Sequence, residues 1–409
     1  MGAGFLCYGL LLFGTAVVAA DDTIRRWDEE RVLFWRDIYT KYNSTQSVVH
    51  DNQYPHVIYE VIDFTSATLP GKTGNDIDQR SAIIAGTIAK YQEILQRFDM
   101  GSAAFYQQSE DERRVYNLFK PINDSDKFRN ASSRDRIRVQ DGRADSFKEA
   151  IKRSSRYLSG MQTILRSYGM PEQLVSLVFV ESLFYLQAVS KVGAAGPWQL
   201  MPATAKRFIK VGDDVDERFD PFISTMAAAQ VLKENYEKLD RSWPLALTAY
   251  NHGLGGMLRA KKEFGGSNLE EIIRNYKSDS FKFASKNFYA QYLAAADAFT
   301  NRNRYFGHIV FDKPLEYDRI LVPYAIPFDK LVAAVGADAG SIMDLNPALT
   351  SLVTSNRLPV PINYPLRTPV GKGTLAIQTL REQEPKHKKQ SAKNYNATAL
   401  PIMLDDLGK

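Results

Sequence analysis

Residues 169–208 read GMPEQLVSLVFVESLFYLQAVSKVGAAGPWQLMPATAKRF, and this stretch decides the fold. Its first part, 174–184, is apolar on nearly every side of a helix, which predicts a helix buried inside a domain. Pro171 suits the first turn of that helix, and Glu172 suits its positive N-terminal end. We therefore expect a single buried helix that runs to residue 184.

Glu181 lies in the middle of this apolar run. A carboxyl group is rarely buried unless it is paired or takes part in chemistry, and no Lys or Arg lies within a helical turn. Removal from water would raise its pKa and keep it protonated at neutral pH, as a general acid requires. Two other interpretations stay open: an ion pair with a distant arginine, or a kink that brings the carboxylate to the surface. No Asp or Glu follows until Asp213, so the chain supplies no second carboxylate locally.

The next feature is a turn rich in glycine and alanine. Gly193 and Gly196 permit a close approach of the backbone to a ligand. Trp198 could present its face to a sugar or pack in the core, and Gln199 offers both a donor and an acceptor. Further on, residues 245–253 (LALTAYNHG) have the pattern of a helix that ends at Asn and Gly.

Apolar residues recur at helical spacing elsewhere in the chain. Residues 27–38 and 83–95 predict helices in an N-terminal region that reads as helical, and the alanine-rich segments 225–239 and 289–299 predict two more. Residues 121–145 are polar and charged, which predicts a linker or a loop excursion.

The C-terminal part changes character. We expect short strands at 320–322 and 358–360, around helical segments at 328–335 and 341–346. The residues after 370 are basic and polar and predict a flexible tail.

The composition excludes several classes of protein. Cys7 is the only cysteine, so disulfide scaffolds, cysteine-ligated zinc and iron–sulfur clusters are ruled out. The five histidines are scattered, so we expect no metal and no cofactor. A net charge of +5 in 409 residues is mild, and we expect no nucleic-acid partner.

Residues 5–20 are apolar and end in small side chains just before Asp21, which predicts a signal peptide cleaved after Ala20. The run is short for a membrane span, and no Lys or Arg precedes it. We therefore expect an exported protein of the periplasm or cell envelope, with an uncleaved membrane anchor as the alternative.

Four motifs in order carry a family resemblance. The Glu-Ser pair at 181–182, GAAGPWQLMPATAKRF at 193–208, DERFDPFISTMAAAQVL at 216–232 and AYN at 249–251 resemble lytic transglycosylases with a goose-lysozyme-like SLT domain. The lead-in RSSRYLSGMQTILRSYGMPEQLVSLVFVESLF at 153–184 is similar to the membrane-bound transglycosylase D type. The resemblance covers about 135–365, and Pro197 stands where that group usually has leucine.

The resemblance implies a mainly α fold with an α+β lysozyme-like catalytic domain. The expected organisation is a signal peptide at 1–20, a helical N-terminal region of unknown role at 21–134, the catalytic domain at 135–304, a small α/β appendage that resembles a degenerate LysM module at 305–370, and a flexible basic tail at 371–409. The appendage contains DLNP at 344–347 but lacks the usual opening of such a module, so glycan binding and simple packing both stay open.

The resemblance also implies peptidoglycan strands as the partner and an activity in which Glu181 acts first as acid and then as base. Bond cleavage would then leave 1,6-anhydromuramic acid ends without consuming water. The residues implied to line the cleft or bind the sugars are Ser190, Gln199, Met201, Tyr250, Asn251 and Tyr289. For the two tyrosines, core packing is the alternative. For the protein, the alternatives are a lysozyme-type hydrolase on the same fold and a non-catalytic cell-wall-binding protein.

Overall fold

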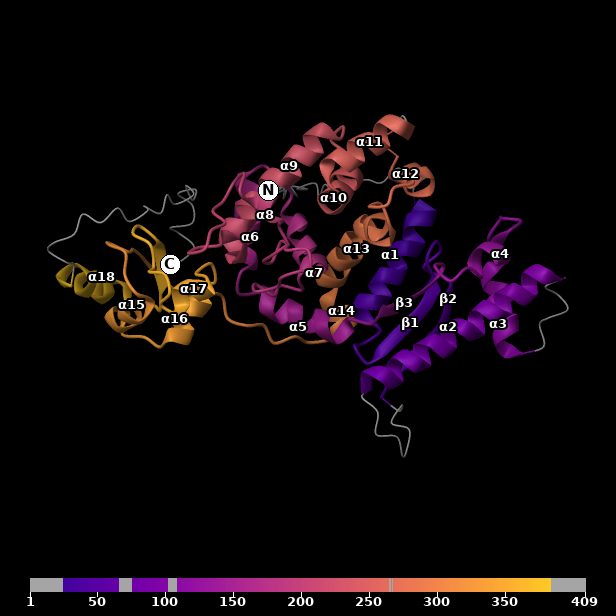
Figure 1. Ribbon diagram of the computed structural model, residues 1–409, viewed down its shortest axis with the longest axis horizontal. Helices are drawn as coiled ribbons and strands as arrows, with labels where there is room; N and C mark the ends of the chain where they lie inside the picture. The colour runs from indigo at the N-terminus through magenta and orange to yellow at the C-terminus, as the bar shows by residue number, and fades with distance from the viewer. Residues whose placement is uncertain (1–24, 66–75, 102–108, 265, 267, 384–409) are drawn as a thin grey trace, which may run out of the picture.

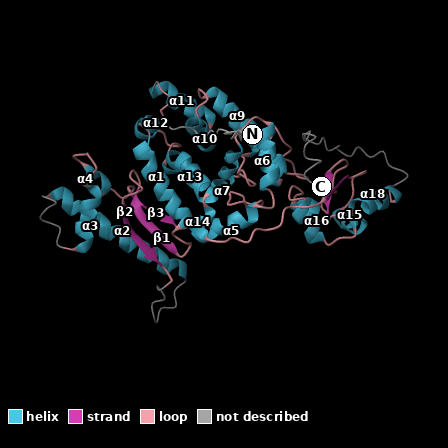
Figure 2. Cartoon of the chain, turned by 180° about the vertical axis from the view of Figure 1, so that it is seen from behind, coloured by secondary structure: helices cyan, strands magenta, loops and turns pink. Residues whose placement is uncertain are grey.

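Helices dominate the chain, and this confirms the predicted mainly α class (Figure 1). The computed structural model describes residues 25–65, 76–101, 109–264, 266 and 268–383. The predicted signal segment and the residues after 383 lie outside this range. From one end of the molecule to the other, an N-terminal sheet with its helices, a central group of helices and a C-terminal unit follow one another (Figures 1 and 2).

The N-terminal region holds the predicted helices α1 (Arg25–Thr40) and α2 (Asp76–Met100), but it is not helical throughout. A three-stranded antiparallel sheet of order β2-β1-β3 is formed by β1 (Gln46–Asp51), β2 (Ile58–Asp63) and β3 (Ile137–Asp141). Val48 pairs with Val61 on one side of the central strand, and Val49 pairs with Val139 on the other. The reading of this region as helices alone was therefore wrong.

The polar segment 121–145, predicted as a linker, supplies part of this sheet. It contains the short helix α4 (Lys127–Ala131) and the strand β3, and it follows α3 (Glu110–Phe119). Ile137 and Ala131 are buried in a core with residues of α2 and α3. Because only a few apolar residues of this segment face that core, its composition hid its place in the fold.

The central helices surround the stretch quoted at the outset. In chain order they are α5 (Ala144–Ser154), α6 (Leu158–Ser167), the 3₁₀ helix η1 (Glu172–Ser176), α7 (Leu177–Glu181), α8 (Pro202–Ala205), the 3₁₀ helix η2 (Glu217–Phe219), α9 (Pro221–Lys238), α10 (Trp243–His252), α11 (Leu254–Phe264), α12 (Leu269–Asn275), α13 (Phe283–Thr300) and α14 (Arg302–Phe306). Asp220 caps α9 by accepting hydrogen bonds from the backbone N–H of Phe222 and Ile223 at 2.9 and 3.0 Å.

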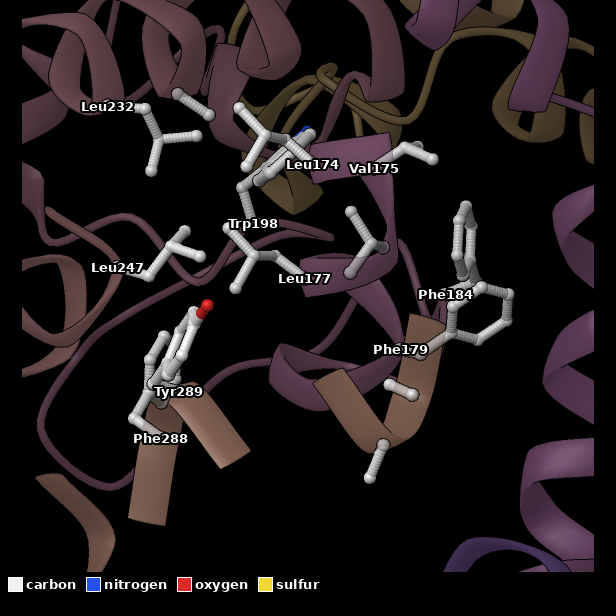
Figure 3. Close-up of a cluster of buried hydrophobic side chains, with 14 of the residues drawn as sticks. Leu174, Val175, Leu177, Phe179, Phe184, Trp198, Leu232, Leu247, Phe288 and Tyr289 are labelled. Atoms are coloured by element: carbon white, nitrogen blue, oxygen red, sulfur yellow. The ribbon is translucent and has the colours of Figure 1, made fainter. Parts of the chain in front are cut away.

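The segment η1–α7 lies in the middle of the main hydrophobic core, as its apolar sequence predicts. Leu177, Phe179 and Phe184 are fully buried there, together with Trp198 (Figure 3). Helix α1 belongs to the same core and packs along α13. Arg31 and Trp35 of α1 both donate to the side-chain oxygen of Asn287, at 2.9 and 3.2 Å, so a polar contact fixes this packing within the apolar core.

The C-terminal unit has its own core, and its two strands enclose the two expected helical segments and a third short helix, with a further helix after the second strand. It comprises β4 (Asp318–Leu321), α15 (Phe328–Val335), α16 (Ala339–Leu345), α17 (Ser351–Thr354), β5 (Pro365–Thr368) and α18 (Gly373–Glu382). The second strand is at 365–368, and not at the predicted 358–360, where only Val360 makes a single bridge with Ile326. Helix α18 lies within the predicted tail, and its buried Ala376 and Leu380 show that the tail prediction was wrong for 373–382.

Buried polar contacts attach the C-terminal unit to the central helices. Arg367 of β5 forms an ion pair with Asp220 at 2.5 Å, and both side chains are almost fully buried. The backbone N–H of Asp216 donates to the carbonyl of Ala348 at 2.9 Å, and Val215 forms a bridge with Leu349. The two parts therefore share a tight interface next to the start of α9.

Membrane-spanning helices are not found within the described part of the chain, since each of its helices is too short or too polar to cross a bilayer.

Candidate active site

The predicted buried helix is broken, and Glu181 is the last residue of α7. Residues 172–176 form a 3₁₀ turn, and the chain leaves the helical conformation at Ser182. Leu183 and Phe184 then take left-handed backbone conformations with φ of 51° and 59°, which cost about 1–3 kcal/mol each in residues with bulky side chains. The expectation that one helix continues to 184, with Glu181 in its middle, was therefore wrong. The kink that the sequence left open is present.

This break places the Glu181 carboxyl on the wall of a cavity of about 490 Å³. The residue is half-buried, so one side of it meets the cavity while the rest is enclosed by protein. Burial raises the pKa of Glu181 to about 8. Among the described residues, no hydrogen bond or ion pair engages its side chain, so the second interpretation left open, a pair with a distant arginine, is not found there. A carboxyl group in this setting carries its proton at pH 7.

A second wall of the cavity comes from the link between β3 and α5, which the sequence did not connect with the site. Asp141, Gly142, Arg143 and Ser146 line the cavity together with Val180 and Glu181. Helices α5 and α7 pack together through Phe147 and Phe179, whose stacked ring centroids are 4.9 Å apart. The repeated apolar spacing of α5 could have predicted a buried helix here, but nothing local predicts which side chains it directs toward Glu181.

Helix α1 also reaches the site, through Tyr39. This buried tyrosine stacks on Phe147 at 5.1 Å. Burial raises the pKa of Tyr39, the positive charge of Arg143 lowers it, and the charge of Glu181 raises it. Tyr39 therefore lies within electrostatic range of both walls, and the N-terminal region contributes directly to the surroundings of the carboxyl group.

Gln199 is the one predicted binding residue that shares the cavity with Glu181. Its side-chain amide donates to the carbonyls of Ala188 and Gly196, at 3.1 and 2.8 Å, which fixes its direction. Its φ of 47° is left-handed, as at Leu183 and Phe184. Ser182 ties the two segments together, because its hydroxyl donates to the carbonyl of Pro197 at 2.9 Å.

Gly196 of the turn serves the protein's own packing. Gly196 has a φ of 79°, and a Cβ at this position would collide with the carbonyl group of Arg218. At Gly196 the predicted close approach is therefore made to the backbone of η2, whereas Gly193 has open space at its Cβ position. Ser190 closes the same turn, since its hydroxyl accepts from the N–H of Ala194 at 2.9 Å. It does not line the cavity.

The AYN segment lies at the end of α10, as predicted, and Gly253 ends the helix with a φ of 90°. The hydroxyl of Tyr250 donates to the carbonyl of Trp198 at 2.8 Å. Burial raises the pKa of Tyr250 and the charge of Glu181 raises it further, so the two side chains are near each other. Asn251 is exposed, and its side-chain oxygen accepts from the hydroxyl of Ser285 at 2.8 Å.

The structure settles the alternatives for Trp198 in favour of the core. It is fully buried, and its ring N–H donates to the hydroxyl of Thr225 at 2.8 Å. Met201 is partly exposed at the start of α8 but does not line the cavity of Glu181.

Tyr289 lines a second cavity, of about 350 Å³, which is bordered by Leu174, Leu247 and Tyr292. It is nearly buried, and its ring stacks with that of Tyr292 at 6.4 Å. The structure thus brings Gln199 into the cavity with Glu181 and places Tyr250 within electrostatic range of Glu181. Tyr250, Ser190, Met201, Asn251 and Tyr289 do not line that cavity.

Metal ligands do not gather at this site. In the part of the chain that the structure describes, no three His, Cys, Asp or Glu side chains are close enough to hold an ion. The Glu181 carboxyl group, protonated at neutral pH, can transfer a proton, and the fixed amide of Gln199 lines the same cavity.

Comparison with known families identifies the class of the central helices. Residues 161–273 match the family model described as Transglycosylase SLT domain, which confirms the resemblance inferred from the motifs. The match begins in α6 and ends in α12, so it contains Glu181, Gln199 and Tyr250. Arg143 and the C-terminal unit lie outside it.

The chain is similar to membrane-bound lytic murein transglycosylase D of Escherichia coli (strain K12), with 30% identity over 154 residues, which are 37% of this chain and 33% of the relative. It is 35% identical over 109 residues to a putative tributyltin chloride resistance protein of Alteromonas sp. (strain M-1), which covers 26% of this chain and 53% of that protein. The chain thus spans about a third and about half of the lengths of these relatives.

Two solved structures show a distant likeness. They are an inactive mutant of the lytic transglycosylase Slt from Pseudomonas aeruginosa and the 70 kDa soluble lytic transglycosylase from Escherichia coli. Each is 16% identical with a TM-score of 0.32. The first covers 58% of this chain and 46% of its own, and the second covers 56% and 44%.

Proposed function

We propose that this protein is a peptidoglycan lytic transglycosylase with Glu181 as its single acid and base. One observation carries the proposal: the Glu181 carboxyl lies on a cavity wall, and burial raises its pKa to about 8. A general acid works best when its pKa lies near the working pH. The SLT match over the same residues and the similarity to transglycosylase D support peptidoglycan as the substrate. Such a substrate implies a location in the cell envelope.

In the proposed reaction, Glu181 protonates the oxygen of the β-1,4 bond that follows a muramic acid unit. The 2-acetamido group of that sugar stabilises the carbon that becomes electron-poor. The carboxylate left on Glu181 then takes the proton of the sugar's C6 hydroxyl, and that oxygen closes a 1,6-anhydro ring. The C6 hydroxyl competes well with water because it is already held close to the reacting carbon. Tyr250 and Gln199 border the carboxyl group and position the sugar.

A hydrolase is the second candidate, because the structure places another carboxylate, that of Asp141, on the same cavity. Glycosidases that use water need such a second carboxylate as base or nucleophile. Asp141 is already engaged: it accepts from the hydroxyl of Ser47 at 2.5 Å and pairs with Arg80 at 3.1 Å. These contacts favour a structural role for the Asp141 carboxylate. They therefore favour the transglycosylase over the hydrolase.

The deciding experiment compares the products of wild type, Glu181→Gln and Asp141→Asn on purified sacculi. We expect muropeptides with anhydro ends, one water lighter than hydrolytic products in mass spectrometry. Removing the acid should slow release by about 10²- to 10⁴-fold. Asp141→Asn should slow it far less.

Two results would contradict the proposal. Products with reducing ends, together with an equal loss in both variants, would establish the hydrolase. Equal release of muropeptides from the sacculi by wild type and Glu181→Gln would favour the third alternative, a wall-binding protein without catalysis.

A further inference from the structure

The cavity that Glu181 lines also carries a cation, Arg143, whose backbone is held in a fixed place. Arg143 lies at the start of α5, where its backbone N–H donates to the carbonyl of Ile38 at 2.8 Å. The neighbouring N–H groups of Gly142 and Ala144 donate to Gln46 and Tyr42, at 2.9 and 2.8 Å. A Cβ at Gly142 would collide with the backbone of Tyr42. The link is therefore locked onto the end of α1, and the exposed Arg143 side chain lines the cavity from a rigid base.

The charged side chains around the cavity leave Arg143 without a counter-ion. The charged side chains that line the cavity are Asp141, Arg143 and Glu181. Asp141 is neutralised by Arg80, and Glu181 is protonated at pH 7 because burial raises its pKa to about 8. Within the described part of the chain, no ion pair or side-chain hydrogen bond engages Arg143. The cavity is therefore net positive at neutral pH.

A positive cavity suits one part of the proposed substrate. The sugar rings of peptidoglycan are neutral, and the negative charge lies on the lactyl substituent of muramic acid. That substituent ends in its own carboxylate, or in a peptide that bears free carboxylates. A guanidinium group binds a carboxylate through two parallel hydrogen bonds, which gives direction as well as attraction.

We propose that Arg143 binds a carboxylate carried by the lactyl substituent of the muramic acid at the cleaved bond. This inference rests on the proposed function and adds an anion site to it. Because Arg143 and Glu181 line the same cavity, the contact would hold the muramic acid beside the acid. Neutral glycans of the same backbone lack the charged group and lose this contact.

The test measures binding in a Glu181→Gln background, which keeps the carboxyl position neutral and stops cleavage. Three ligands of equal length are compared: peptide-bearing glycan strands, strands whose peptides an amidase has removed, and chitin oligosaccharides. We expect Arg143→Gln to raise Kd for the anionic strands on the order of 10-fold, as for a lost charge-assisted hydrogen bond, and to leave Kd for chitin nearly as it was. Arg143→Lys should retain part of the affinity.

The ligands also distinguish the two sources of the carboxylate. A loss confined to peptide-bearing strands assigns the contact to the peptide, and a loss on stripped strands assigns it to the lactyl group. Arg134→Gln, which changes an exposed arginine outside the cavity, is the matched control. An equal loss on all three ligands, or none on any, would overturn the anion site. Failure of the proposed function would show separately, as absence of sacculus cleavage by the wild type.

Discussion

The surroundings of Glu181 disfavour its charged form, and yet its carboxyl group is accessible from a cavity. Its sequence context predicted the raised pKa, because apolar neighbours and the absence of a nearby cation are visible in the chain. Its placement was not predictable, since it depends on the left-handed conformations of Leu183 and Phe184. Nothing in bulky apolar residues indicates such a backbone. The predicted roles of the sugar-binding residues all stay predictions, those of Gln199 and Tyr250 as well as those of Ser190, Met201, Asn251 and Tyr289.

The raised pKa of Glu181 has a consequence for stability. Because its pKa is about 8 in the folded protein against 4.5 as the ordinary value, folding favours the protonated form. That contribution is fully present below about pH 4.5 and is lost as the pH rises through 8. We expect Glu181→Gln to match the wild type at pH 4.5 and to exceed its free energy of unfolding by about 2 kcal/mol at pH 9, a value reduced for the carboxyl's partial exposure.

Urea unfolding at pH 4.5, 7 and 9 measures this difference. Glu237→Gln is the control, because Glu237 is an exposed glutamate on α9 that lies outside the cavity. If the two variants show the same pH dependence, the carboxyl group at 181 is not held in its neutral form by the fold.

At the scale of elements, helices with strong apolar spacing were predictable and strands with polar faces were not. Helices α2, α9 and α13 lie where the spacing placed them. Strand β3 was missed because Arg138 and Gln140 alternate with its apolar residues in a segment that is charged throughout. Because β3 was not predicted, part of the site was not predicted either, since the link after β3 lines the cavity.

The turn that carries Gln199 depends on the absence of a side chain at Gly196. Gly196→Ala should disrupt this turn, because it combines a left-handed φ with a collision against the Arg218 backbone. We expect a loss of about 3 kcal/mol or more in the free energy of unfolding, together with a loss of activity on sacculi.

Gly169→Ala separates the two causes. Gly169 has a similar φ of 71° but open space around its Cβ position. It should cost only about 1–2 kcal/mol, the cost of the backbone conformation alone. Equal losses in the two variants would show that the contact with η2 does not matter.

At the scale of the whole molecule, the sequence suggested a row of separate units, and the structure joins them. Helix α1 lies in the same hydrophobic core as α7 and α13, and the C-terminal unit is fastened beside α9. Such contacts between distant segments leave no local signature. Asn346 of the DLNP segment shows this, because its side chain binds the backbone of Arg367 and so holds α16 to β5.

The ion pair between Arg367 and Asp220 is a buried link between the C-terminal unit and the start of α9. Arg367→Met should leave the Asp220 carboxylate buried without its cation, at a cost of about 3–5 kcal/mol in the free energy of unfolding. Thermal unfolding measures the loss. Arg357→Met, at an exposed arginine of the same unit, should have little effect. The double variant Arg367→Met with Asp220→Asn should recover part of the loss, and no recovery would contradict the ion-pair explanation.

The stacked rings of Phe147 and Phe179 join α5 and α7, the two helices at whose ends Arg143 and Glu181 line the cavity. Arg143 lies four residues before Phe147, and Glu181 lies two residues after Phe179. The packing of the two rings therefore bears on the distance between these two side chains. A change in either ring would alter how bulky a sugar substituent can pass, while every polar group at the site stayed the same. Substitutions at residues that do not touch the substrate would therefore change which sugar substituents the cavity accepts.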